Sequence, residues 1–64
     1  MSPEVSRMMR DSMLCIRVNG GREMIAQRAD GRLIVLAERI AAYPPSAQTK
    51  ALRLIAEARE LIAA

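Results

Sequence analysis

Apolar side chains recur at helical spacing along the first part of the chain. Residues 2–4, Ser-Pro-Glu, are typical of a helix start, because serine can cap, proline suits the first helical position and glutamate favours the positive end of the helix dipole. The pattern predicts a helix from about residue 3 to 18 that ends at Asn19-Gly20. The apolar face of this helix consists of Val5, Met8, Met9, Met13 and Ile16.

The rest of the chain repeats the helical spacing in two further segments. Within residues 22–43, apolar residues recur at alternating spacings of three and four, as on one face of a helix, and Pro44-Pro45 ends this pattern. Residues 47–63 carry the clearest amphipathic pattern, with one apolar row and one charged row. Because the link between the two segments is short, they predict an antiparallel helical hairpin and an all-α fold of two to three helices.

An alternative interpretation of residues 13–18 stays open. Leu14, Ile16 and Val18 alternate with other residues as in a strand, and Asn19-Gly20 is a strong hairpin signal. A strand there, followed by helices, resembles the outline of a ribbon-helix-helix dimer. The resemblance implies that Cys15 and Arg17 enter the major groove of DNA. The next segment lacks period-two alternation, however, so the sequence favours the helix.

Composition limits how such a chain is stabilised. Its 64 residues allow one small domain, residues 1–64, and a domain of this size is only marginally stable alone. One Cys and no His exclude an internal disulfide and a structural zinc site within one chain. Tyr43 is the only aromatic residue, so the core has few large side chains. We therefore expect the core to be completed by oligomerisation, as a homodimer or a larger assembly.

Charge and hydropathy indicate the compartment in which the protein is expected. Ten Lys and Arg against seven Asp and Glu leave a net charge of +3, with no basic tail or block. The longest apolar run, Leu33–Ala37, is far too short to cross a bilayer, and no signal peptide is visible. A lone Cys15 suits a reducing compartment, so we expect a cytoplasmic protein that does not engage a membrane.

The sequence gives little support for any catalytic site. Cys15 has no histidine to activate it, and Glu57 and Glu60 belong to a solvated helix face with basic neighbours. The Asn-Gly-Gly-Arg-Glu stretch at residues 19–23 has none of the spacings of a phosphate loop. We therefore expect no enzyme, no cofactor, no metal and no evident small-molecule substrate.

The remaining hypothesis is a small regulator, adaptor or inhibitor that binds another protein through apolar helix faces. Its apolar contacts would be adaptable methionines and the branched residues of the Leu33–Ala37 run, and arginines at the rim would set orientation. The candidate partner-binding residues are Met8, Met9, Met13, Ile34, Val35, Arg28, Arg32 and Arg39. The alternative is a dimeric DNA-binding repressor or antirepressor that uses Arg17 and Arg22.

Overall fold

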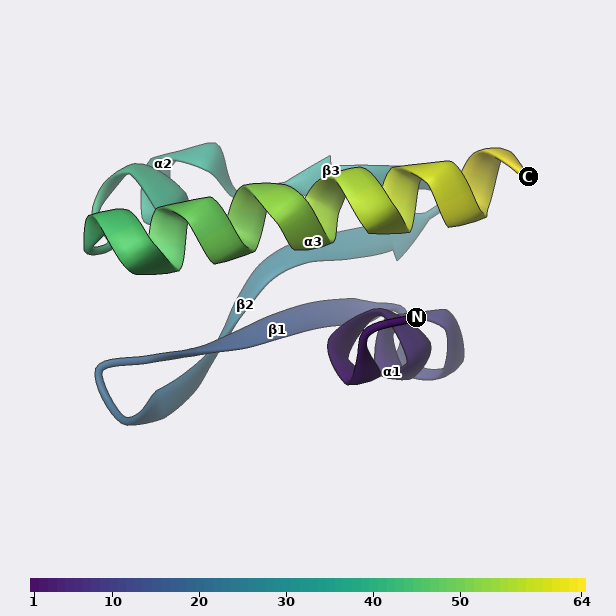
Figure 1. The fold of residues 1–64 in the computed structure, drawn as a ribbon. Helices are drawn as coiled ribbons and strands as arrows, with labels where there is room; N and C mark the ends of the chain where they lie inside the picture. The colour runs from purple at the N-terminus through teal and green to yellow at the C-terminus, as the bar shows by residue number, and fades with distance from the viewer.

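The computed structural model describes all 64 residues and shows an α+β fold (Figure 1). A three-stranded antiparallel sheet, in the order β1-β2-β3, combines with three helices, so the all-α prediction is wrong. In chain order the elements are α1 (Pro3–Asp11), β1 (Met13–Val18), β2 (Gly21–Ala29), β3 (Arg32–Val35), α2 (Ala37–Ala41) and α3 (Pro45–Ala63).

Two tight turns build the sheet from consecutive strands. Asn19 and Gly20 join β1 to β2 with φ angles of 52° and 76°, and Asp30 and Gly31 join β2 to β3 with 52° and 72°. Two adjacent residues with positive φ are the signature of the type I′ hairpin turn, which Asn-Gly and Asp-Gly adopt most readily. The helix expected over residues 22–43 is therefore replaced by β2, β3 and the short α2.

A β-bulge explains why the strand pattern of β2 is hidden in the sequence. Leu14 of β1 pairs with Ala26, but Cys15 pairs with Met24, so Ile25 is the extra residue. Ile25 and Ala26 are both fully buried, although neighbouring strand residues normally point to opposite faces. The extra residue thus interrupts the period-two alternation that would have marked this segment as a strand.

The two terminal helices agree more closely with the sequence pattern. α1 starts at Pro3 as expected, but it ends at Asp11, because Ser12 adopts a left-handed conformation with φ of 62° and its N–H bonds to the carbonyl of Met8. Met13 and Ile16 therefore belong to β1 rather than to one long helix. The helix expected over residues 47–63 is present as α3.

The core lies between the sheet and the helices α1 and α3, which pack on the same face of the sheet (Figure 1). No polar or charged residue is buried. The core side chains are Val5, Met8, Leu14, Ile16, Val18, Ile25, Ala26, Ile40, Tyr43, Ala51, Leu54, Ile55 and Ala58.

Two polar contacts hold the outer parts of the molecule to this core. The Tyr43 hydroxyl donates to Glu23 Oε2 at 2.7 Å, and burial, together with the Glu23 carboxylate, raises the pKa of Tyr43. Ser2 donates from its backbone N–H and its Oγ to the two carboxylate oxygens of Glu57, each at 2.7 Å. The first contact holds the link before α3 to β2, and the second holds the start of α1 to α3.

None of the three helices has both the length and the apolar character needed to cross a membrane.

Candidate binding surface

The sheet has one face that no helix covers, and we call it the outer sheet face. α1 and α3 both lie on the opposite side (Figure 1). Strand alternation and the register across the bulge place nine side chains on the outer sheet face. They are Met13, Cys15, Arg17, Arg22, Met24, Gln27, Ala29, Arg32 and Ile34.

The middle of the outer sheet face is mostly apolar. Met13, Gln27 and Ile34 form one row across the three strands, and Cys15 and Met24 pair in the next row. Met13 is 45% exposed and Ile34 is 48% exposed, and neither packs against the core. An antiparallel sheet that faces water on one side normally carries polar residues there. This face is therefore suited to contact with something other than water.

Arginines occupy both ends of the outer sheet face. Arg17 and Arg22 lie directly opposite each other at the β1–β2 turn, and Arg32 lies at the other end, opposite Ala29. None of the three forms an ion pair, because the salt bridges of the molecule join other residues. No acidic residue lies on this face; Glu23, the nearest in the sequence, points to the inner side and is bonded to Tyr43. The outer sheet face therefore carries uncompensated positive charge.

The structure brings only part of the predicted partner-binding set together. Met13, Ile34 and Arg32 lie on the outer sheet face, as do Arg17 and Arg22 of the DNA-binding alternative. Met8 is fully buried in the core, Val35 packs against the core from the inner side, and Arg39 is exposed on α2.

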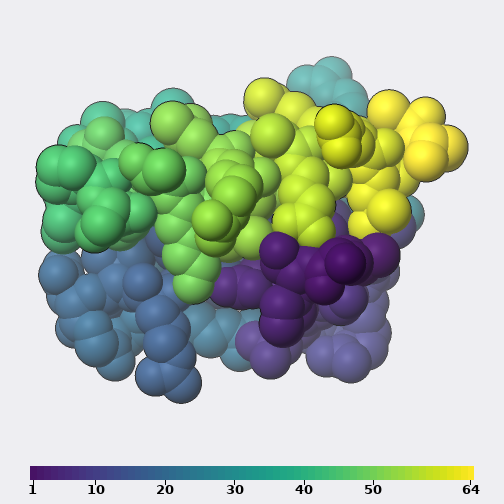
Figure 2. All heavy atoms as spheres, in the orientation of Figure 1, coloured from purple at the N-terminus to yellow at the C-terminus, as the bar shows by residue number.

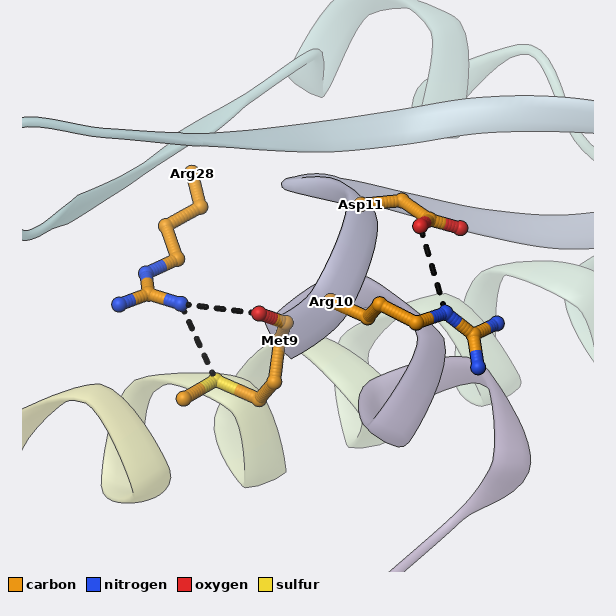
Figure 3. Close-up of polar contacts among 4 residues, drawn as sticks. All are labelled: Met9, Arg10, Asp11 and Arg28. Carbon is orange, nitrogen blue, oxygen red and sulfur yellow. Dashed lines mark hydrogen bonds and ion pairs between the residues drawn. The ribbon is translucent and has the colours of Figure 1, made fainter.

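Met9 and Arg28 contact each other instead of lining a surface. The Arg28 guanidinium donates to the Met9 carbonyl oxygen at 3.3 Å and approaches the Met9 sulfur at 3.7 Å (Figure 3). It thereby places a cation and a donor at the last turn of α1, where carbonyl groups lack helical partners. Next to this contact, Arg10 and Asp11 form an exposed ion pair at 3.4 Å (Figure 3). Arg28 thus connects β2 to the end of α1.

Met24 and Gln27 are parts of the outer sheet face that the sequence pattern does not predict. Both belong to β2, where the bulge disguises the strand. The signal that could have found them is the pair of two-residue turns at Asn19-Gly20 and Asp30-Gly31, because such turns determine which residues pair across a hairpin.

The structure shows where two of the candidate catalytic groups, Glu57 and Cys15, lie. No cluster of three or more His, Cys, Asp or Glu could hold a metal ion. Glu57 is engaged by Ser2, whose two hydrogen bonds lower the pKa of Glu57, so this carboxylate serves to hold α1 in place. Cys15 is a free thiol on the outer sheet face.

Comparison of the chain with family models, with curated proteins and with solved structures finds no match. The role of the outer sheet face therefore rests on its own chemistry, which combines an apolar middle, arginines at both ends and no carboxylate.

Proposed function

We propose that the protein is a non-catalytic regulator or adaptor that binds another protein through the outer sheet face. The observation that supports this proposal is the exposure of Met13 and Ile34, which flank Gln27 in one row, on a sheet face that no helix covers. Covering this row with a partner would remove apolar surface from water at a gain of roughly 25 cal/mol per Å². Methionines at 13 and 24 suit such a contact, since their flexible side chains adapt to a partner's shape.

The charge of the outer sheet face defines the partner's chemistry. A complementary protein would present an apolar strip with carboxylates at both ends, where Arg17, Arg22 and Arg32 can pair with them. A second copy of the chain is a poorer partner. When two outer faces are apposed about a two-fold axis parallel to the strands, the end that carries Arg17 and Arg22 in one copy lies against the same cationic end of the other. The proposal therefore favours a different protein over the homodimer.

Nucleic acid fits the same face less well. Arg17 and Arg22 could contact phosphates, but the middle of the face has no aromatic side chain on which bases could stack. The proposal places the protein in a reducing compartment such as the cytoplasm, where the free thiol of Cys15 is stable.

The test compares two substitutions of exposed apolar residues. Ile34→Glu puts a carboxylate in the middle of the outer sheet face, whereas Leu52→Glu puts the same charge on α3, where Leu52 is 61% exposed. The tagged wild-type chain is used to capture a partner from its own cells, and the purified partner is then titrated by calorimetry. We expect Leu52→Glu to bind like the wild type and Ile34→Glu to bind at least about 30-fold more weakly, a loss of about 2 kcal/mol.

Three results would contradict the proposal. One is equal partner affinity for Ile34→Glu and wild type. Another is a light-scattering mass of the isolated chain that doubles with concentration and returns to the monomer in Ile34→Glu, which would assign the face to a second copy. The third is salt-sensitive binding of duplex DNA that Ile34→Glu abolishes, which would assign it to nucleic acid.

A further inference from the structure

A second feature of the surface is a cleft of about 490 Å³ at the free edge of β1. Four elements contribute to its walls, because its lining includes Arg7 of α1, Arg17 of β1, Arg22 of β2 and Lys50 of α3. Figure 2 shows the hollow between the β1–β2 hairpin (blue) and α1 (purple), below α3 (green). The volume lies within the range that small-molecule sites occupy, roughly 300–1,000 Å³.

The charge of the molecule is concentrated at this cleft. Four basic residues and one acidic residue, Glu4, line it, so the cleft carries a formal charge equal to the +3 of the whole chain. The remaining six basic residues are balanced by the remaining six acidic residues. The residues outside the cleft therefore have a formal net charge of zero.

The cations of the cleft are only partly neutralised within the protein. Lys50 Nζ lies 3.0 Å from Glu4 Oε2. Hydrogen bonds from the backbone at Glu4 and from Lys50 lower the pKa of Glu4, so this carboxylate is ionised at neutral pH. Arg7, Arg17 and Arg22 have no ion-pair partner. Arg17 and Arg22 also lie directly opposite each other in the sheet, where like charges are unfavourable.

We propose that this cleft binds a small molecule through a phosphate or polyphosphate group. Arg7, Arg17 and Arg22 line the cleft from α1, β1 and β2, and a phosphate presents several charged oxygens that can accept hydrogen bonds from all three. A single carboxylate has fewer oxygens and less negative charge than a phosphate, so it can pair with fewer of the three arginines. The lining contains no aromatic residue, so recognition falls on the anionic part of the ligand rather than on a stacked base.

The proposal is tested with inorganic triphosphate titrated by calorimetry into the wild-type chain at constant ionic strength. Citrate serves as the carboxylate control. Arg7→Gln should weaken triphosphate binding about tenfold, because it removes charge-assisted hydrogen bonds to the phosphate oxygens. Arg53→Gln removes an exposed arginine of α3 outside the cleft and should change the affinity less than about twofold. Glu4→Gln removes the only negative charge of the cleft and should strengthen binding about fivefold.

Several outcomes would overturn the cleft assignment. They are the absence of saturable triphosphate binding, equal losses in Arg7→Gln and Arg53→Gln, or citrate binding as tightly as triphosphate. Tighter binding of a single-stranded DNA oligomer than of triphosphate, with the same loss in Arg7→Gln, would assign the cations to nucleic acid instead. The result is separable from the partner-binding proposal, because Ile34→Glu lies outside the cleft and should leave triphosphate affinity unchanged.

Discussion

Arg17 and Arg22 face each other across the β1–β2 hairpin, with no carboxylate on their side of the sheet. A like-charge pair in directly opposed positions destabilises a hairpin, while an opposite-charge pair contributes roughly 0.2–1 kcal/mol. Stability of the hairpin therefore does not explain the presence of two arginines here. Arg17 and Arg22 lie on the outer sheet face and also line the cleft. Their presence is explained if both binding sites use these unpaired cations.

Arg22 is a residue at which stability and triphosphate binding should change in opposite directions. Arg22→Glu should raise the free energy of unfolding by about 0.5 kcal/mol, measured by urea denaturation, because it converts the repulsive pair into an attractive one. The same substitution should abolish triphosphate binding. Arg22→Gln should lie between the wild type and Arg22→Glu in both properties. A lower stability of Arg22→Glu than of the wild type would contradict this explanation of the pair.

At the scale of elements, α3 and the start of α1 could be predicted from the sequence because each has a regular amphipathic pattern. The sheet could not, for two reasons. Ile25 is an extra residue in β2, so apolar residues stand next to each other and imitate helical spacing. Met8 and Met13 also share a helical face in the sequence, but the left-handed Ser12 between them sends one into the core and the other to the outer sheet face. The residues of the outer sheet face could therefore not be predicted, because they depend on a strand register that the hydrophobic periodicity of the sequence does not reveal.

The contact between Ser2 and Glu57 gives α1 and α3 a pH-dependent connection. Hydrogen bonds from Ser2 favour the ionised carboxylate, so the pKa of Glu57 in the folded chain is lowered from its ordinary value of 4.5. A lowered pKa contributes stability above about pH 4.5, and this contribution is lost as the pH falls through the folded-state pKa.

Glu57→Gln should therefore be less stable than the wild type at pH 7, and the difference should shrink on acidification towards pH 3. The measurement is the free energy of unfolding of both proteins from urea denaturation at several pH values. Glu60→Gln is the matched control on the exposed side of α3. A difference between wild type and Glu57→Gln that stays constant from pH 7 to pH 3 would contradict the role of the ionised carboxylate.

At the scale of the whole molecule, the fold is one layer of helices on one layer of sheet. The Cα atoms extend over 30 × 20 × 15 Å, and the shortest dimension leaves no room for a third layer. The small number of large side chains in the sequence predicts a core that is completed by another chain. In the structure most apolar residues of the helices are buried within the chain, and the large apolar residues left exposed are Met1, Met13 and Ile34 of the sheet, and Leu52 of α3. The proposed partner surface is therefore the outer sheet face rather than a helix face.

The five methionines allow the central claim to be tested in one experiment. Met13 and Met24 lie on the outer sheet face, whereas Met8 of α1 is fully buried in the core. The chain is labelled with ¹³C at the methionine methyl groups, and its NMR spectrum is recorded as the captured partner is added. We expect the Met13 and Met24 signals to shift or broaden in proportion to the bound fraction, while the Met8 signal keeps its position. Unchanged Met13 and Met24 signals at saturating partner would contradict the claim that the outer sheet face is the binding surface.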